Sequence, residues 1–374
     1  MSIFISSGEA SGDHYTANLA KHLRASGFTG AIWGMGGIES RRAGIDVQWH
    51  GERLQLLGLT EVLAAIPSIY SLLNEMISRI MQENPSAVVV CDSPDFHMRL
   101  IAKLRARGYK GRIFYISPPS VWAWRSGRAD DLRRYTDECL PLFRFEHEFL
   151  LSRGCTSYWQ GHPLLEEFRE KEGMPTPLDG LYDKDKMIAF LPGSRRSEIR
   201  ALLPMMEEAA DTLARDGWQP VFSVAPGLNP AVRDSMIEEF TAKNIPYYDG
   251  PGRDMMAAAH CAVGASGTIT VESLLLGCYM IVAYRLNPLT ALIGRAIIKT
   301  KHYAMANILA GREMFPELLQ GRATTENMLR YTRAWLTDDG GCRAEAAALM
   351  ESTRLTLGSE GVYDFWSKRI LEAA

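Results

Sequence analysis

Leu191-Pro192-Gly193-Ser194-Arg195 is the first of two glycine-marked loops that indicate how this chain folds, and Ala265-Ser266-Gly267-Thr268 is the second. Each loop follows a short apolar run, residues 187–191 in the first case and 261–264 in the second, and leads into a stretch with helical spacing. A strand, a tight turn and a helix N-terminus make an anion site, because unpaired N–H groups and the positive end of the helix dipole converge there. Two such sites, one with an arginine beside it, favour a diphosphate.

Glu272 extends this interpretation from a diphosphate to a nucleotide. It follows Thr268 by one helical turn and lies on the same helix face, where its carboxylate can accept hydrogen bonds from ribose hydroxyls. The sequence therefore predicts a pocket for a nucleotide diphosphate. The alternative is two ordinary strand-to-helix turns whose glycines serve packing, and either loop alone is compatible with it.

Length and composition narrow the class of protein. The chain has 374 residues, which favours two domains, and 47% hydrophobic and 23% charged residues, as in an ordinary globular protein. A net charge of −3 excludes a generally basic nucleic-acid-binding protein. Six scattered cysteines with no C-x-x-C pair favour reduced thiols in a cytoplasm over disulfides or zinc. We expect neither a signal peptide nor a membrane span, because the longest uncharged run, residues 255–271, is interrupted by Gly, Ser and Thr.

Short apolar runs alternate with helical patterns, which predicts parallel sheets covered on both faces. Expected strands are residues 3–5, 87–91, 112–116 and 157–159 in the first half and 187–191, 220–224, 262–265 and 279–283 in the second; expected helices include 15–23 and 96–107. The predicted fold class is α/β, with two Rossmann-like doubly wound domains facing across a cleft. The expected divisions are a first domain at 1–166, a linker at 167–186, a second domain at 187–342, and helices at 343–374 that pack back on the first domain or on a partner chain.

Two acidic residues follow the apolar run at residues 88–91, and only one has an obvious structural role. Asp95 precedes a helical run and is a candidate N-cap. Asp92 lies at the carboxyl end of the strand, where ligands of open α/β sheets bind, so its carboxylate is a candidate base for an attacking hydroxyl. Glu9, in the glycine turn after the first strand, faces the same edge. The alternatives are a solvated loop acid at Asp92 and a helix-capping loop around Glu9.

Residues 54–80 form an unusually apolar stretch, in which Pro67 is expected to interrupt any single helix. Such a stripe is usually part of a core. However, Leu56-Leu57 and Leu72-Leu73 widen the apolar arc beyond one buried face, which suits a surface that contacts lipid.

A basic segment supports contact with lipid. Between Arg99 and Arg134 there are ten basic residues and two acidic ones, a net charge of +8 in a chain of −3. This clustering attracts anionic headgroups or a phosphorylated acceptor. Nucleic acid is the alternative, but no recognised binding motif accompanies the segment. Trp122 and Trp124 lie within it, either as interface aromatics or as core residues.

Other motif-like patterns do not meet the requirements of the sites they resemble. Gly34-Met35-Gly36-Gly37 lacks the spacing of a dinucleotide-binding turn, since residue 39 is Glu39. Asp183-Lys184-Asp185 precedes a strand rather than following one, and no Gly-Lys-Ser/Thr loop occurs. We therefore expect neither a metal nor a cofactor.

Together these segments resemble the lipid-A-disaccharide synthases, glycosyltransferases with the two-domain GT-B fold. The matching stretches follow the family's order and spacing and are residues 8–13, 92–96, 120–125, 161–163, 191–195, 265–268, 282–285, 307–312 and 316–320. The chain departs from the family at Ala306, where a proline is usual, and at Pro118-Pro119, which adds a residue before Ser120. Neither departure removes a proposed chemical group.

The resemblance implies transfer of 2,3-diacylglucosamine from UDP-2,3-diacylglucosamine to the 6-hydroxyl of 2,3-diacylglucosamine 1-phosphate (lipid X), with inversion and without a metal. Asp92 matches the family's candidate base, Glu9 an acid at the same site, and Arg195 the arginine that balances the leaving diphosphate. The residues matching the donor site are Ser194, Gly267 and Thr268 beside the phosphates, Glu272 at the ribose, and the polar Asn307 and Gln320.

The resemblance also implies a cytoplasmic enzyme of a Gram-negative bacterium, peripherally associated with the inner membrane. The expected membrane-contacting residues are Leu59, Leu63, Ile66, Leu72 and Leu73. The nearest alternatives are a UDP-sugar 2-epimerase and a peptidoglycan-type transferase, which share the nucleotide-binding half. A sugar-nucleotide sensor without catalysis would need Glu272 and Arg195 but not Asp92.

Overall fold

The computed structural model describes residues 1–374 apart from 52–53, 55–58, 171–172, 287–299, 339–340 and 374, and only the backbone of residues 59–65 and 373. The pair Leu56-Leu57 therefore lies outside the described residues. The chain divides into two compact units. The first contains Met1–Glu167 and Leu357–Ala374, and the second contains Phe168–Thr356.

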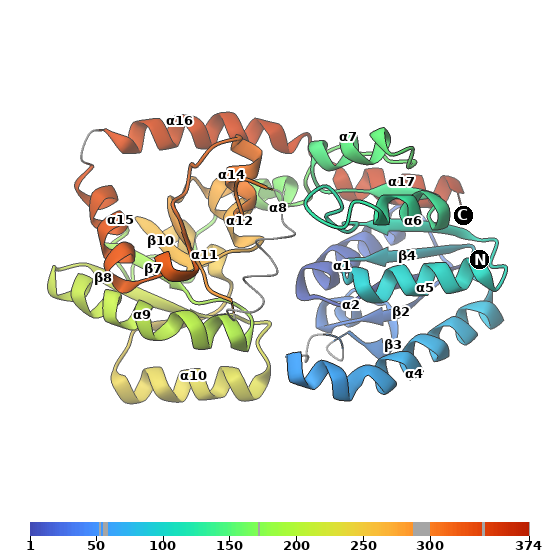
Figure 1. The fold of residues 1–374 in the computed structure, drawn as a ribbon, viewed down its shortest axis with the longest axis horizontal. Helices are drawn as coiled ribbons and strands as arrows, with labels where there is room; N and C mark the ends of the chain where they lie inside the picture. The colour runs from blue at the N-terminus through green and yellow to red at the C-terminus, as the bar shows by residue number, and fades with distance from the viewer. Residues whose placement is uncertain (52–53, 55–58, 171–172, 287–299, 339–340, 374) are drawn as a thin grey trace. The chain divides into compact units, whose positions relative to one another are not determined.

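A parallel six-stranded sheet forms the centre of the first unit (Figure 1). Its strands are β1 (Ser2–Ser7), β2 (Ala31–Gly36), β3 (Asp46–His50), β4 (Ala87–Cys91), β5 (Arg112–Ile116) and β6 (Glu138–Leu140). The order across the sheet is β3-β2-β1-β4-β5-β6. The sheet thus grows in one direction from β1 and in the other from β4. This is the doubly wound order, whose topological switch point lies between the two strands that begin the two halves.

The expected strands at 3–5, 87–91 and 112–116 are confirmed as β1, β4 and β5. The expected strand at 157–159 is wrong, because Ser157 forms only an isolated bridge with Cys139. The Trp159 indole, two residues later, donates instead to the carbonyl of Leu142. Strand β2 and the two edge strands, β3 and β6, were not predicted.

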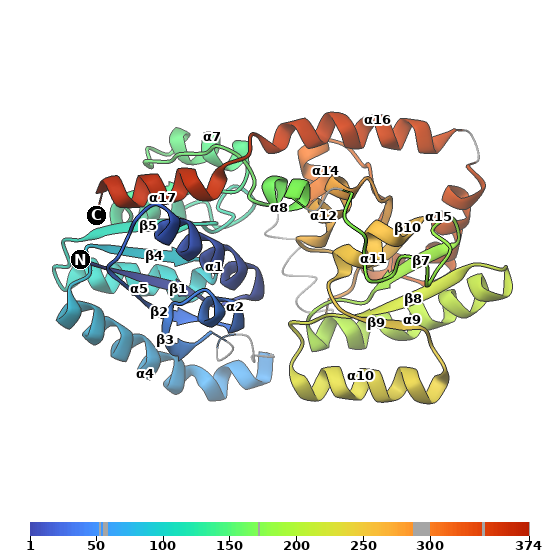
Figure 2. The same ribbon diagram turned by 180° about the vertical axis from the view of Figure 1, so that it is seen from behind.

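Helices cover the sheet of the first unit. They are α1 (Ala10–Ala25), α2 (Ile38–Arg42), α4 (Leu59–Glu83), α5 (Pro94–Ala106), α6 (Arg128–Tyr135), α7 (Arg144–Ser152), α8 (Leu164–Glu170) and α17 (Val362–Ala373). Helix α8 extends past Glu167, where this part of the first unit ends. The C-terminal helix α17 packs beside α1 (Figure 2). Helices α4, α5 and α6 pack in succession and bury their apolar residues with Phe4, Val88 and Tyr115 of the sheet.

Helix α4 corrects two predictions. Pro67 lies inside this single helix rather than dividing it, because proline removes one amide donor and leaves the remaining helical hydrogen bonds in place. Leu72 and Leu73 are 5% and 1% exposed and belong to the hydrophobic core, so they are not available for contact with a membrane. Ile66, by contrast, is 39% exposed. The side chains of Leu59 and Leu63 lie outside the described part of the structure.

The second unit repeats the same strand order. Its strands are β7 (Met187–Leu191), β8 (Gln219–Val224), β9 (Tyr247–Asp249), β10 (Cys261–Ala265), β11 (Met280–Tyr284) and β12 (Glu317–Leu319). They are arranged as β12-β11-β10-β7-β8-β9, all in parallel, so the switch point lies between β7 and β10. The four strands expected in this half are confirmed as β7, β8, β10 and β11.

The helices of the second unit are α9 (Arg196–Arg215), α10 (Pro230–Lys243), α11 (Gly252–Ala258), α12 (Ile269–Leu276), α14 (Met305–Ala310), α15 (Thr325–Thr337) and α16 (Cys342–Arg354), with the 3-10 turns η1 (Gln320–Arg322) and η2 (Leu355–Leu357). Helix α9 packs against α15, and α16 packs on α12 and α14. Of the two C-terminal helices, only α17 therefore belongs to the first unit. None of the helices in the described ranges is both long and apolar enough to cross a bilayer.

Candidate active site

Asp92 occupies a sharp turn at the switch point of the first unit. It follows β4 directly, and α5 begins at Pro94. Asp92 and Ser93 have φ values of +55° and +42°, which place two consecutive non-glycine residues in the left-handed region. This conformation is unfavourable for residues with a Cβ and is maintained only where the surrounding structure fixes it.

The loop after β1 surrounds the Asp92 carboxylate. The Gly8 amide donates to Oδ1 at 3.0 Å, and the Glu9 amide donates to Oδ2 at 3.2 Å. A Cβ on Gly12 would overlap with Oδ2, and a Cβ on Gly8 would overlap with the Ser93 hydroxyl. These two glycines therefore allow the loop to approach β4 closely enough for backbone amides to hold the carboxylate.

Burial raises the pKa of Asp92 to about 7. The Ser93 side chain and the amides of Gly8 and Glu9 oppose this effect because they stabilise the charged form, and the negative charge of Glu9 adds to it. A base is most effective when its pKa lies near the working pH, so Asp92 is suited to accept a proton near neutrality. The Glu9 side chain is exposed at the same edge of the sheet.

Asp95 differs from Asp92, as the sequence predicted. It is 66% exposed and lies in the first turn of α5. Its carboxylate pairs with the guanidinium groups of Arg125 and Arg128, which also lie over the ring of Trp124. However, Asp95 is not the N-cap, because Ser93 occupies that position.

Three buried side chains around Asp92 were missed from the sequence. The carbonyl of Asp92 accepts hydrogen bonds from His97 Nδ1 at 2.8 Å and from the Tyr115 hydroxyl at 2.9 Å. The other ring nitrogen of His97 lies 2.7 Å from Ser6 Oγ. Burial lowers the pKa of His97 to about 4, so its ring is neutral. A histidine on the apolar face of a helix has no sequence signal that separates this role from ordinary core packing.

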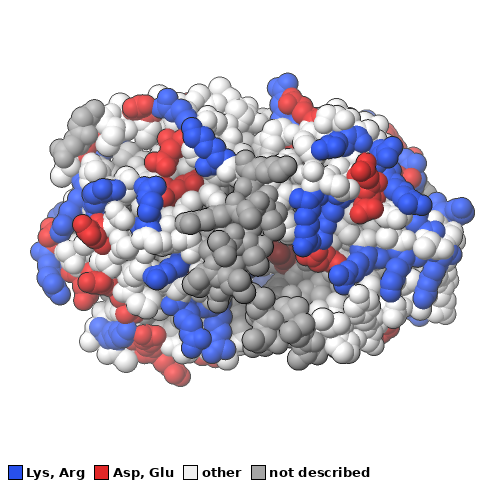
Figure 3. Space-filling model, in the orientation of Figure 1, with Lys and Arg blue, Asp and Glu red and all other residues white. Residues whose placement is uncertain are grey.

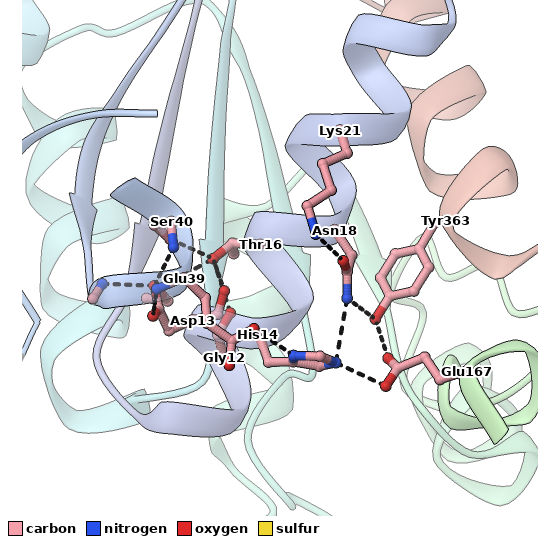
Figure 4. Close-up of polar contacts among 12 residues, drawn as sticks. Gly12, Asp13, His14, Thr16, Asn18, Lys21, Glu39, Ser40, Glu167 and Tyr363 are labelled. Carbon is pink, nitrogen blue, oxygen red and sulfur yellow. Dashed lines mark hydrogen bonds and ion pairs between the residues drawn. The ribbon is translucent and has the colours of Figure 1, made fainter. Parts of the chain in front are cut away.

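Asp13 explains the glycine turn that resembled a dinucleotide site. Its carboxylate accepts hydrogen bonds from the amides of Gly37 at 2.6 Å, Glu39 at 2.9 Å and Ser40 at 3.2 Å (Figure 4). The N-terminus of α2 is thus occupied by a carboxylate of the chain itself. The turn at Gly34-Met35-Gly36-Gly37 is structural.

His14 and its partners join four helices of the first unit, α1, α2, α8 and α17. Its two ring nitrogens lie 2.7 Å from carboxylate oxygens of Glu39 and Glu167, and the Tyr363 hydroxyl donates to Glu167 at 2.7 Å (Figure 4). Although burial lowers the pKa of His14, the hydrogen bonds and charges of Glu167 and Glu39 raise it to about 9. The cluster holds α1 against α8 and α17.

The loop after β7 differs from a bare anion site. Gly193 has a φ of +119°, and a Cβ there would lie 2.6 Å from Oε2 of Glu198. The same carboxylate accepts from the Ser194 amide at 3.3 Å and lies 3.4 Å from the Arg195 guanidinium, which is 62% exposed. Glu198, in the first turn of α9, therefore occupies the Ser194 amide and the Arg195 guanidinium, which were expected to bind phosphate. This contact of Glu198 was missed from the sequence.

The loop after β10 lies beside the β7 loop. Gly264 pairs with Leu191, and a Cβ on Gly193 would approach Ala265 Cβ to 3.4 Å. Gly267 and Thr268 are exposed, and Thr268 is the N-cap of α12. Glu272 lies one turn further, with its amide bonded to the carbonyl of Thr268. The structure thus brings the two glycine-marked loops together at the second switch point.

Asn307 does not have the role expected of it. It is fully buried, and its side-chain oxygen accepts from the amides of Met314 and Phe315, both at 2.9 Å. Its nitrogen donates to the Phe315 carbonyl at 2.8 Å and to Glu317 at 2.9 Å. An amide side chain can make four hydrogen bonds, and all four are internal here. Asn307 therefore shapes the chain before β12 and has no group left for a donor substrate.

Gln320 also bonds to the protein backbone. In the amide orientation that satisfies both of its groups, it donates to the carbonyl of Leu286 at 3.1 Å and accepts from the Leu286 amide at 3.0 Å. Elsewhere in the described ranges, no three His, Cys, Asp or Glu side chains converge as a set of metal ligands.

Two doubly wound units, each with polar loops at its switch point, define an α/β protein of the GT-B class. MnaA of S. aureus, solved with UDP, has a similar fold, with a TM-score of 0.66 and 13% identity over 99% of this chain and 94% of that one.

Sequence comparison identifies the family. The model of the lipid-A-disaccharide synthetase family matches residues 3–363. Lipid-A-disaccharide synthase of Myxococcus xanthus is 33% identical, with 99% of this chain and 97% of the relative aligned, and that of Anaeromyxobacter dehalogenans strain 2CP-C is 36% identical, with 96% and 94% aligned. The chain belongs to the lipid-A-disaccharide synthase family, which consists of glycosyltransferases of lipid A biosynthesis.

Proposed function

We propose that this enzyme transfers 2,3-diacylglucosamine from UDP-2,3-diacylglucosamine to the 6-hydroxyl of 2,3-diacylglucosamine 1-phosphate, with inversion and without a metal. The observation that carries the proposal is the Asp92 carboxylate. It is held by the Gly8 and Glu9 amides at a switch point and has a pKa of about 7. A sugar-nucleotide sensor would have no use for such a group.

Asp92 acts as the base in this reaction. As the acceptor's 6-oxygen attacks the anomeric carbon, the carboxylate takes the hydroxyl proton and the bond from that carbon to the diphosphate of UDP breaks. The oxygen enters opposite the leaving group, so the configuration at the anomeric carbon inverts. One base is sufficient for this single displacement.

The nucleotide binds at the second switch point. The exposed Arg195 guanidinium offsets the charge that develops on the departing diphosphate, which is the role that a metal has in other transferases. The Ser194 amide and the loop at Gly267 and Thr268 bind phosphate oxygens, and Glu272 binds the ribose. The UDP complex of a protein with the same fold supports a uridine nucleotide. For the phosphates to bind here, Glu198 must release the Ser194 amide and Arg195.

A surface formed by α4 and α5 contacts the anionic inner membrane. Ile66 and Tyr70 are 39% and 40% exposed, and Arg99 and Lys103 lie over the Tyr70 ring at 5.6 and 5.5 Å. Figure 3 shows basic side chains in a row over α5, next to a largely uncharged area over α4. Apolar and aromatic side chains bordered by cations favour a bilayer interface.

Only part of the predicted basic segment contributes to this surface. Arg105 pairs with Asp137, and Arg112 lies near both Asp137 and Glu138. These acids follow the segment in sequence and offset its charge in the structure. The α4–α5 surface is therefore defined by Ile66, Tyr70, Arg99 and Lys103.

Release of UDP from UDP-2,3-diacylglucosamine, measured with and without lipid X in detergent containing a chelator, tests the proposal. We expect release only with lipid X and no inhibition by the chelator. Release without lipid X would indicate hydrolysis, and inhibition by the chelator would contradict independence from metal. Binding of UDP without any turnover would shift the proposal to another acceptor or to a binding role.

A further inference from the structure

We infer that His97 and Tyr115 are positioning residues that hold the Asp92 turn, and with it the base, in its reactive place. The inference rests on the proposed role of Asp92 as base. Both side chains donate to the backbone carbonyl of Asp92 and not to its carboxylate. They act on the reaction only through the backbone.

The backbone at this turn needs such support. Asp92 and Ser93 are both left-handed, and the two donors converge on the single carbonyl that links them. His97 comes from the first turn of α5, and its amide bonds to the Ser93 carbonyl at 3.0 Å. Tyr115 comes from β5, where it pairs with Val90 of β4. The turn is thus fixed from the helix that follows it and from the neighbouring strand.

The hydrogen-bond partners of His97 determine its tautomer. A carbonyl oxygen can only accept, so Nδ1 carries the proton, and Nε2 then accepts from the Ser6 hydroxyl. The ring is neutral, and every polar atom in this chain of contacts has a partner. Ser6 lies on β1 and is fully buried, so His97 connects β1 with the end of β4, the two strands that flank the switch point.

Loss of either donor would allow the strained turn to relax. The carboxylate would then leave the Gly8 and Glu9 amides, which bind it only in its present place. The titratable groups that face it are Glu9 from the β1 loop, Cys91 from β4 and Tyr115 from β5. A misplacement of about 1 Å is enough to lower a rate about 10²-fold.

Two substitutions distinguish the contact of His97 with the Asp92 carbonyl from its contact with the Ser6 hydroxyl. His97→Asn keeps an N–H donor close to the position of Nδ1 and can retain the bond to the Asp92 carbonyl. His97→Gln places its amide near the position of Nε2 and can retain only the bond to Ser6. We expect kcat to fall about 10²-fold in His97→Gln and in Tyr115→Phe, and only a few-fold in His97→Asn.

The pH profile of kcat distinguishes positioning from a general effect on folding. In His97→Gln and Tyr115→Phe the carboxylate gains solvent, which lowers its pKa, and loses the Gly8 and Glu9 amides, which raises it. Burial has the larger influence on this pKa, so the acid limb should move to lower pH while the KM for the donor changes little. A structural effect would reduce the amount of active enzyme and leave the limb in place. Tyr115→Phe removes a single oxygen atom and provides the same test if His97→Gln does not fold.

Asp92→Asn, measured in parallel, distinguishes a failure of the positioning role of His97 and Tyr115 from a failure of the proposed role of Asp92 as base. If Asp92→Asn retains a near-normal rate, Asp92 is not the base and the proposed function fails at that step. If Asp92→Asn is inactive while His97→Gln and Tyr115→Phe keep both kcat and the acid limb, the positioning role is overturned and the base stands. Equal loss of kcat in His97→Asn and His97→Gln would also overturn it, because the bond to the Asp92 carbonyl would then not matter.

Discussion

The two switch points share one strand order but hold their polar groups differently. At β1 and β4, a carboxylate from one strand end is held by amides from the other, and buried donors fix its backbone. At β7 and β10, Glu198 comes from the helix that follows its own loop, and Arg195 is 62% exposed. The first arrangement is fixed by the protein alone, which suits the base proposed there. In the second, the proposed nucleotide could bind only after Glu198 releases the Ser194 amide and Arg195.

The largest expected effect comes from removing Asp92, the proposed base. Asp92→Asn should lower kcat about 10³-fold, since a general base contributes 10²- to 10⁴-fold, and should leave the Kd for UDP nearly unchanged. Asp95→Asn is the matched control, because Asp95 lies three residues away and is exposed. Steady-state UDP release and calorimetric titration with UDP measure the two effects. A near-normal rate in Asp92→Asn would show that Asp92 is not the base, and the proposed difference in function between the two switch points would then be wrong.

The raised pKa of Asp92 also predicts how pH affects the enzyme. The reaction needs the carboxylate, so kcat should rise with pH up to about 7 and then level off. Stability follows the opposite course. Because the folded pKa lies above the unfolded value of about 3.9, the folded state binds the proton more tightly, and this contribution is lost as the pH rises through about 7. Asp92→Asn should therefore raise the Tm at pH 8, and an unchanged or lower Tm would contradict a buried charge at this position.

Arg195→Ala should have the next largest effect. If Arg195 lies beside the diphosphate as proposed, loss of its charge should lower kcat/KM about 10²-fold and weaken UDP binding. Arg200→Ala, an exposed arginine one turn along α9, serves as the control. If both variants behave alike, the guanidinium acts through the general field of the helix rather than at the phosphates.

A further prediction concerns the α4–α5 surface, which has no counterpart assigned in the second unit. Arg99→Gln combined with Lys103→Gln should weaken binding to vesicles with anionic lipid about thirtyfold, since each cation near such a surface contributes ~1 kcal/mol. Arg200→Gln with Arg215→Gln removes the same charge from α9 and should change binding little. Co-sedimentation measures both. Equal loss in the two variants would indicate an effect of net charge alone.

Leu73→Ser tests the corrected position of the apolar stripe. Leu73 is 1% exposed in the core, so the substitution should destabilise the fold by about 3 kcal/mol and leave the vesicle affinity of the folded protein unchanged. Chemical denaturation and co-sedimentation measure the two quantities. Weaker vesicle binding without loss of stability would indicate that Leu73 contacts the membrane and is not part of the core.

The smallest expected effect is at Glu198. Glu198→Gln removes a negative charge from the proposed phosphate-binding loop after β7 and keeps an acceptor for the Ser194 amide, so UDP should bind about fivefold more tightly, equivalent to ~1 kcal/mol. Glu207→Gln, which removes an acid from the same helix and leaves the loop intact, controls for charge. Weaker binding in Glu198→Gln would mean that the carboxylate contributes to the nucleotide site.

Much of the fold and part of the site could be predicted from local patterns. Apolar runs at β1, β4, β7 and β10 are buried strands of parallel sheets, and the polar or glycine residues that follow them mark the carboxyl edge. Asp92 was distinguishable from Asp95 because only Asp95 precedes a helical pattern. The edge strands of the first sheet were missed, because β6 has only three residues and β3, with the sequence DVQWH, has no apolar run.

The sequence by itself determined the α/β class, the two glycine-marked loops and the position of Asp92 at the end of a strand, because these follow from neighbouring residues. Only the tertiary structure decided that Leu72 and Leu73 are buried, that all four hydrogen bonds of Asn307 are internal, and that His97 reaches the Asp92 carbonyl. These outcomes depend on which residues distant in sequence come within hydrogen-bond or packing distance. The spacing of apolar residues shows which face of a helix or strand is buried, but it does not identify the residues that pack against that face.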